Sequence, residues 1–281
     1  MLGCVILNFN DAPTTIKLVR SIKNYRVINY LVIVDNHSTD NSFVELKKLE
    51  ALDCKHIKVI RTVKNGGYGY GNNVGIRYCK QLGCNYVLIA NPDVSFLEST
   101  IQESLAFLVQ HQECAAVAPK MVGGGAIKFA NPLKDMTFSI MLLNRIFKPR
   151  YYSPHFYKNK TWAYVDALPG SLVLFDLNKF YLVGLYDESV FLYHEEVIIG
   201  KRLASFKFKS ALLLKTTYYH YHSISVKKTY KKSIKPKEIA MNSHKYYLKK
   251  YCHANKLVLS VFSLVSFIAK IEMFIWLHLK K

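Results

Sequence analysis

One short polar motif in this chain has the residue types that hold a divalent cation. Asn91-Pro92-Asp93 follows the apolar run 86–90 and supplies amide and carboxylate oxygens. Oxygen ligands of this kind suit Mg²⁺ or Mn²⁺, whose coordination shell substrate phosphate oxygens then help to fill. The same tripeptide is also a good turn sequence. The motif alone therefore leaves a metal site and a plain turn as alternatives.

A second polar motif follows the apolar run 30–34 and could bind a base or a sugar ring. It reads DNHSTDNS and begins at Asp35. The Asp35 carboxylate can accept a hydrogen bond from the imide N–H of a pyrimidine or from a ribose hydroxyl. Ser38, Asp40 and Asn41 are typical helix N-caps, whereas Asp35 comes too early in the chain to cap the same helix. We therefore expect a ligand role for Asp35.

A glycine- and asparagine-rich stretch, residues 65–75, reads NGGYGYGNNVG. It follows an expected strand and opens a helix, where backbone N–H groups and the helix dipole can hold an anion. It is not a dinucleotide fingerprint, because Val74 stands where a third glycine or alanine is needed. It is not a Walker loop, because no Lys-Ser or Lys-Thr pair follows the glycines. We expect phosphate or nucleotide contact here; the alternative is a turn that needs the positive φ of glycine.

The elements that must position these motifs alternate regularly over the first part of the chain. Apolar runs predict strands at 4–9, 30–35, 57–62, 86–90 and 115–118, with helices expected at 12–23, 41–52, 72–81 and 99–111. Strands alternating with helices predict an α/β fold with a doubly wound, mostly parallel sheet and helices on both faces. Ligands of such sheets bind at the carboxyl ends of the strands. Polar residues that follow strands are therefore the candidate site.

The second half of the chain departs from this alternation. Residues 123–166 are interpreted as an insertion or lid, and a strand is expected to resume at 171–175. An acidic segment, Asp187 to Glu196, precedes a helix that we expect to begin near Glu195. A further strand is expected within 207–219.

Composition narrows the class of protein. The chain has 281 residues, of which 51% are hydrophobic and 21% charged, which excludes wholesale disorder. This length favours one main domain with an appendage. The six cysteines show no zinc-site spacing, so we expect reduced, mostly buried thiols in a cytoplasmic protein.

The net charge of +20 is concentrated toward the end of the chain, where residues 226–281 hold 13 Lys and 2 Glu. A lysine-rich segment favours nucleic acid or an anionic membrane surface as partner. The 13 uncharged residues 257–269 are too few for a membrane span, which needs about 20. An amphipathic helix lying in the membrane interface fits better. We expect a peripheral protein on the inner face of a membrane and no nucleic acid; a helix packed on the core or on a partner is the alternative.

In this order, the motifs resemble those of the inverting glycosyltransferases of family 2, which have the GT-A fold, and most closely the rhamnosyltransferase-like branch. The matching segments are Val5–Asn10, Val34–Asp40, Asn65–Gly75, Asn91–Asp93, Pro169–Phe175, Phe191–Glu196 with Arg202, and His220 with Ser225. The resemblance covers roughly residues 3 to 226 and leaves out the lysine-rich tail. It implies a GT-A domain at 1–225 and a basic, amphipathic helical extension at 226–281.

The resemblance also implies a reaction and its residues. One sugar would pass, with inversion, from a nucleoside-diphosphate sugar such as dTDP-rhamnose or a UDP-sugar to a glycan or lipid-linked hydroxyl in bacterial surface polysaccharide synthesis. Mg²⁺ or Mn²⁺ would be held by Asp93, with support from His220, and Glu196 would be the general base in preference to Glu195. The nucleotide would be lined by Asn8, Asn10, Asp11, Asp35, Asn65, Gly66, Gly67, Asn72 and Asn91.

Three positions depart from the family pattern. Glu196 stands where the family usually has Asp, Ile198 where a further Asp is frequent, and Asn91 where the metal motif often begins with Asp. Two other classes stay open: a nucleotidyltransferase and a non-catalytic nucleotide-sugar-binding protein. The former would usually need a basic residue soon after the first strand, and none follows Asn8 to Asp11. A homodimer is also left open.

Overall fold

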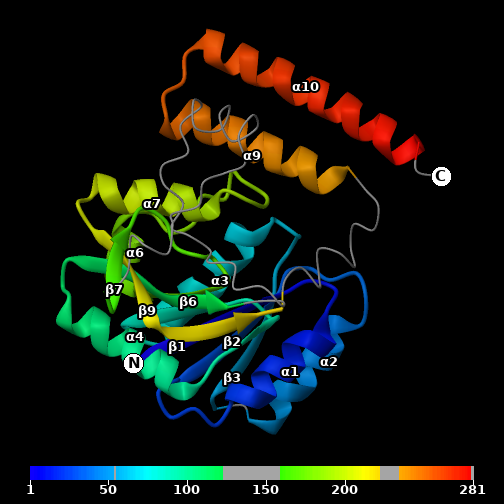
Figure 1. The fold of residues 1–281 in the computed structure, drawn as a ribbon. Helices are drawn as coiled ribbons and strands as arrows, with labels where there is room; N and C mark the ends of the chain where they lie inside the picture. Colours follow the sequence, from blue (N-terminus) through cyan, green and yellow to red (C-terminus); the bar gives the residue numbers. More distant parts are fainter. Residues whose placement is uncertain (54, 123–158, 222–233, 280–281) are drawn as a thin grey trace.

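The computed structural model describes residues 1–53, 55–122, 159–221 and 234–279, with the side chains of the last helix described to residue 272. Most of the predicted insertion and Ser225 lie outside these residues. The described strands form one sheet in the order β3-β2-β1-β4-β8-β6-β9-β5, and β7 pairs with β9 beside this path (Figure 1).

The first half of the chain builds a parallel sheet, as predicted. Its strands are β1 (Leu2–Asn8), β2 (Tyr30–Asp35), β3 (Ile57–Arg61) and β4 (Tyr86–Ala90). Successive residues of β1 point to opposite faces, so Cys4 and Ile6 join one apolar cluster and Val5 joins another.

Helices cover both faces of the sheet. Three of them supply side chains to the cluster of Cys4 and Ile6: α1 (Ala12–Ile22), α2 (Ser42–Leu52) and α4 (Glu98–Gln110). Three others supply the cluster of Val5: α3 (Tyr68–Gln81), α6 (Leu177–Leu182) and α7 (Glu195–Ser205). The predicted α/β class with two helical layers is therefore confirmed.

The second half of the chain makes the complete sheet mixed. It adds β5 (Val94–Ser95), β6 (Cys114–Val122), β7 (Trp162–Val165), β8 (Leu172–Asp176) and β9 (Lys209–His220). β8 runs antiparallel to both β4 and β6, β9 runs parallel to β6, and β5 and β7 pair antiparallel with β9. The parallel prediction thus holds for β1 to β4, where the strand–helix alternation that motivates it is present.

The glycine-rich stretch lies mostly inside a helix. α3 begins at Tyr68, four residues before the predicted start at Asn72. The reason is packing: a Cβ at Gly71 would come within 2.3 Å of a Leu7 methyl carbon, and one at Gly75 within 2.5 Å of a Val5 methyl carbon. Glycine at these positions lets α3 approach β1 closely.

The last two helices, α9 (Lys235–Tyr251) and α10 (Lys256–Leu279), form a layer outside α7 (Figure 1). Tyr247 of α9 is buried in an apolar cluster with Val197 and Ile198 of α7. α10 packs on α9 through Phe262, which is 4% exposed. Among the described residues, no helix has both the length and the apolar character that crossing a bilayer requires.

Candidate functional site

The carboxyl ends of β1 and β2 meet at Asn8 and Asp35, which are register partners and are both fully buried. Asn8 Nδ2 donates to Asp35 Oδ1 at 3.1 Å, and the Ser38 N–H donates to Asp35 Oδ2 at 3.1 Å. Asn8 Oδ1 accepts from the Thr15 hydroxyl at 2.9 Å. The two predicted nucleotide ligands thus lie beneath the turn after β2 and hold its shape, with their polar atoms bonded within the protein.

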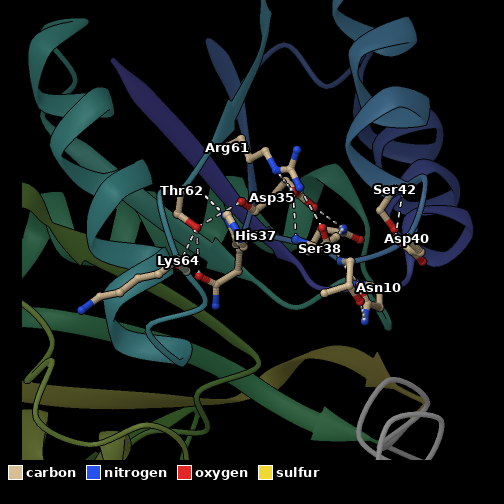
Figure 2. Close-up of polar contacts among 12 residues, drawn as sticks. Asn10, Asp35, His37, Ser38, Asp40, Ser42, Arg61, Thr62 and Lys64 are labelled. Atoms are coloured by element: carbon tan, nitrogen blue, oxygen red, sulfur yellow. Dashed lines mark hydrogen bonds and ion pairs between the residues drawn. The ribbon is translucent and has the colours of Figure 1, made fainter.

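The exposed side chains near this turn include those of His37 and Arg61, which Figure 2 labels. His37 is exposed and has a φ of +62°, and its Nδ1 lies 3.0 Å from the Thr62 carbonyl oxygen. A carbonyl can only accept, so Nδ1 carries the proton and a neutral ring presents Nε2 as an acceptor. Arg61 Nη2 donates to the Ser38 carbonyl at 2.9 Å. His37 and Arg61 are thus exposed side chains at this edge of the sheet.

Arg61 was not among the residues predicted from sequence. It ends β3, at the same sheet edge as Asp35, and its Nε lies 3.5 Å from Asp35 Oδ2. Its guanidinium also lies over the Phe43 ring, 5.2 Å from the centroid. Its position at the carboxyl end of an expected strand was the available signal.

Asn10 joins the turn after β1 to the turn after β2. Its backbone N–H donates to Ser38 Oγ at 2.9 Å, and its Oδ1 accepts from the Thr39 N–H at 2.8 Å. Asn10 has a φ of +52°, a region that Asn enters more readily than most residues. Asp11 is buried beside it at the start of α1. Of the two, Asn10 is the one partly exposed at the site.

The start of α3 contacts the acidic segment of the chain. Gly67 has a φ of +92°, and a Cβ there would lie 2.2 Å from the Phe191 carbonyl oxygen. The Tyr68 N–H donates to that oxygen at 2.8 Å. Asn65 Oδ1 accepts from the Gly67 N–H at 3.2 Å. The Gly67 and Tyr68 N–H groups thus have partners within the protein, and Gly67 has the positive φ that the turn alternative requires.

Two further predicted nucleotide ligands have local partners. Gly66 is half-buried against Tyr70, whose ring a Cβ would meet at 2.4 Å. Asn72 is buried inside α3 and donates to the Tyr68 carbonyl at 3.0 Å. The structure therefore places Asn72 within the protein, and Asn65 and Gly66 at its partly exposed edge.

Asp93 and His220, the predicted metal ligands, lie 127 residues apart in the chain and contact each other in the structure. Asp93 Oδ1 lies 3.1 Å from His220 Nε2, and the pairing of β5 with β9 sets Val94 opposite His220. Among the described residues, no group of three or more His, Cys, Asp or Glu could hold a metal. A carboxylate and an imidazole fit a cation that takes its other ligands from a diphosphate and water.

A chain of contacts links the metal motif to the glutamates. The Tyr68 hydroxyl lies 3.2 Å from Asn91 Oδ1 and 2.7 Å from the Gly170 carbonyl oxygen. A Cβ at Gly170 would come within 3.0 Å of Glu196 Oε1. Glu195 and Glu196 line one small cavity together with Tyr68 and Gly170. The predicted base and the predicted metal motif therefore lie on either side of Tyr68.

The environment of the two glutamates changes their acidity. Burial raises the pKa of Glu195 above its usual range, and the neighbouring charge of Glu196 raises it further. Burial also raises the pKa of Glu196. A carboxylate with a raised pKa is a stronger base once it is ionised. Glu195 is 6% exposed, and Glu196 is half-buried beside the cavity.

Comparison with known proteins gives the family. The model of glycosyl transferase family 2 matches residues 4–169. A low-salt glycan biosynthesis hexosyltransferase of Haloferax volcanii, Agl10, is 29% identical over 202 residues, which is 70% of this chain and 59% of the relative. The chain thus spans about six tenths of this relative's length.

Solved structures share the fold at low sequence identity. GalNAc-T7 with UDP, GalNAc and Mn²⁺ superimposes with a TM-score of 0.63 and 16% identity, over 80% of this chain and 44% of that one. The Pyrobaculum calidifontis mannosyltransferase PcManGT with GDP-Man and Mn²⁺ superimposes with a TM-score of 0.61 and 12% identity, over 91% of this chain and 65% of that one. S. aureus TarS with UDP has a TM-score of 0.57 and 16% identity, over 93% of this chain and 70% of that one. With the family model matching more than half of its length, the chain belongs to glycosyl transferase family 2 and has the GT-A fold.

Proposed function

We propose that this protein is a metal-dependent, inverting glycosyltransferase that uses a nucleoside-diphosphate sugar. The observation that carries the proposal is the contact chain from Asn91 through Tyr68 and Gly170 to Glu196, with the Asp93–His220 pair at the same edge of the sheet. This arrangement sets a cation-binding pair beside a carboxylate with a raised pKa. Family membership and the Mn²⁺ complexes of its structural relatives support it.

The donor would lie across the carboxyl ends of β1, β2 and β4. Its base would face His37, Arg61 and Asn65, and its diphosphate would face Asp93 and His220. A bound divalent cation offsets the negative charge that develops on the departing diphosphate. With Nδ1 facing the Thr62 carbonyl oxygen, His37 can offer Nε2 as an acceptor, which suits the imide N–H of uracil or thymine. We therefore favour a UDP- or dTDP-linked sugar, dTDP-rhamnose included.

Inversion requires one base and one displacement. Glu196 would take the proton of the acceptor hydroxyl while its oxygen attacks the anomeric carbon, and the bond to the diphosphate oxygen breaks on the opposite side. No covalent sugar–enzyme intermediate forms, so a second nucleophile is not needed. Glu195, the more buried of the two, would line the pocket beside it, with its own pKa raised by burial and by the charge of Glu196.

The acceptor would be a glycan or a lipid-linked hydroxyl, and α10 supports a place at an anionic membrane. Its outward row is apolar and exposed: Leu257, Val261, Leu264, Phe267, Ile268 and Ile271. Leu257, Val261, Leu264, Ile268 and Ile271 recur every three or four positions, with Phe267 beside them, and so share one side of the helix. Exposed lysines on α9, including Lys245 and Lys249, add attraction to anionic lipid. We infer peripheral attachment and a role in bacterial surface polysaccharide synthesis.

Vesicle flotation tests the membrane part. Wild-type protein should float with vesicles containing an anionic phospholipid at low salt and be partly released by high salt. Leu264→Glu should lose flotation, whereas the matched change Val109→Glu, at an exposed apolar residue of α4, should not. Protein that ignores anionic vesicles would make this row a packing or oligomerisation surface.

A panel of nucleotide sugars tests the donor site. Thermal stabilisation by a nucleotide sugar that requires Mn²⁺ or Mg²⁺ and is abolished by EDTA would support the proposal. Products separate the rivals: a nucleotidyltransferase would release pyrophosphate, and a non-catalytic binding protein would release nothing. Release of a nucleoside diphosphate identifies the transferase.

A further inference from the structure

The acidic segment that carries the two glutamates is held from outside by α9, and we propose that His244 on this helix is a positioning residue for Glu196. This inference rests on the proposed function, because it gives α9 a part in that reaction. It also makes the C-terminal extension more than a membrane attachment. The contacts fall into two sets, one at each end of the segment.

The first set fixes the segment at Asp187. Its Oδ2 accepts from the hydroxyls of Tyr246 at 2.9 Å and Tyr251 at 2.5 Å, both on α9. The Lys250 ammonium donates to the same oxygen at 3.0 Å. Arg202 Nη2 of α7 lies 3.2 Å away. Because the Asp187 side chain is 5% exposed, it depends on these partners, and they tie α9 to the start of the segment.

The second set fixes the segment immediately before the glutamates. Ser243 Oγ donates to the Leu192 carbonyl at 2.8 Å. One residue along α9, His244 Nδ1 lies 2.8 Å from His194 Nε2, and the ring centroids are 4.5 Å apart. His194 directly precedes Glu195. The polar side of α9 thus reaches the backbone and the side chain of the segment at neighbouring points.

This second set holds an unfavourable backbone. Tyr193 and His194 have φ values of +71° and +72°, which residues with a Cβ rarely adopt and which persist only where the surroundings hold them. The His194 carbonyl accepts from the Ile198 N–H at 3.0 Å and so closes the first turn of α7. The residue whose ring contacts His244 therefore also accepts the first-turn hydrogen bond of the helix that carries Glu196.

The bond between the two rings is a neutral one. Burial lowers the pKa of His194 to about 3 and that of His244 to about 4, so both rings are uncharged near neutral pH. Within the part of the chain that the structure describes, the other ring nitrogens, His194 Nδ1 and His244 Nε2, have no hydrogen-bond partner. Their shared contact is thus the side-chain hydrogen bond that joins the two rings. The Phe262 ring of α10 also stacks on His244, with the ring centroids 5.2 Å apart and an interplanar angle of 18°.

Loss of the His244 ring should let the turn at residues 193–194 relax and shift Glu196 away from Gly170. A misplacement of about 1 Å can lower the rate about 10²-fold. Asp93 directly precedes β5 and His220 ends β9, away from these contacts with α9, so donor binding should stay close to wild type. The expected signature is a lower kcat with an unchanged KM for the donor.

Three variants test this. His244→Ala should lower kcat by about 10-fold or more, and His244→Asn should restore most of it, because an Asn amide reaches roughly where Nδ1 lies. Leu248→Ala is the matched control: Leu248 is fully buried on the same helix and has an apolar side chain. It should lower Tm but keep kcat when both variants are assayed at equal distances below their Tm.

Hydrogen exchange of residues 192–198 in the donor-free protein gives a readout besides activity. Exchange at the Ile198 amide should be faster in His244→Ala than in Leu248→Ala. A wild-type kcat in His244→Ala, or an equal loss in Leu248→Ala, would overturn the inference. If the wild-type protein transfers no sugar, the proposed function fails, and the exchange rates then decide the positioning role by themselves.

Discussion

Replacing Glu196 by Gln removes the base and leaves the side chain nearly the same size. Gln fits the same pocket as Glu because the two side chains have the same length. The pocket is close-fitting at this point, since a Cβ added at Gly170 would lie 3.0 Å from Glu196 Oε1. A general base contributes about 10² to 10⁴ in rate. This corresponds to about 2.7 to 5.5 kcal/mol of activation free energy. We expect a loss in kcat within that range and little change in the KM for the donor.

The pH dependence makes the same test sharper. Burial raises the pKa of Glu196, and the base acts only when it is deprotonated. The wild-type kcat should therefore rise with pH through an acid limb above the usual carboxyl range, and this limb should vanish in Glu196→Gln. In Glu195→Gln the limb should remain, because burial raises the pKa of Glu196 and this variant keeps the Glu196 carboxyl.

The assay is release of nucleoside diphosphate at saturating donor and acceptor, followed by chromatography across the pH range where the protein stays folded. Glu195→Gln is the matched control, since it makes the same substitution at the adjacent residue. If Glu195→Gln is inactive and Glu196→Gln is active, the two roles are exchanged. If both variants keep the wild-type kcat, the base is elsewhere and the reasoning from burial and family motif fails.

Three further changes have definite expected results. Asp93→Ala should nearly abolish turnover and remove the Mn²⁺-dependent part of donor binding, measured by thermal shift; unchanged activity would contradict the metal assignment. Asp187→Ala should lower the free energy of unfolding by about 3–5 kcal/mol, measured by urea denaturation. Burial alone would raise the pKa of Asp187, but its hydrogen bonds, that from Tyr251 first, outweigh burial and lower the pKa. The stabilisation is therefore present above the unfolded pKa of about 3.9 and is lost as pH falls below that value. An equal stability difference between wild type and variant at pH 3 and pH 7 would refute this prediction. Gly67→Ala should destabilise the fold, because φ is +92° and the new Cβ would meet the Phe191 carbonyl; an unchanged Tm would show that the loop can move aside.

Much of the fold could be predicted from the sequence because its signals are local. The apolar runs and the helices between them fix β1 to β4 as a parallel set. The pairing of Asp93 with His220 came from the order of family motifs, and no local pattern contains it. The mixed pairing of the later strands was not predicted, since it depends on contacts across segments without a regular alternation.

Side-chain direction was the main limit at the site. Asp35 ends a strand at the expected edge, but its carboxylate turns inward to Asn8 and the Ser38 N–H. His37 stands above the turn instead. A strand end fixes where a residue lies along the chain, while the partners that satisfy a buried polar group decide where it points.

The docking of α9 was also beyond sequence reasoning. Its many lysines predicted a solvated or membrane-facing segment. The residues that bind the acidic segment, such as Ser243 and Tyr247, are four positions apart and share one side of the helix. Because that side is polar and aromatic, it lacks the apolar periodicity that usually predicts packing.

The most direct test of the central claim is NMR analysis of the transferred sugar. Wild-type protein with Mn²⁺, a nucleotide sugar and an acceptor should yield a nucleoside diphosphate and a glycoside whose anomeric configuration is opposite to that of the donor. EDTA or Asp93→Ala should stop both products. A product with the donor's configuration, or full transfer in the presence of EDTA, would contradict the account of a single displacement assisted by a cation at Asp93 and His220.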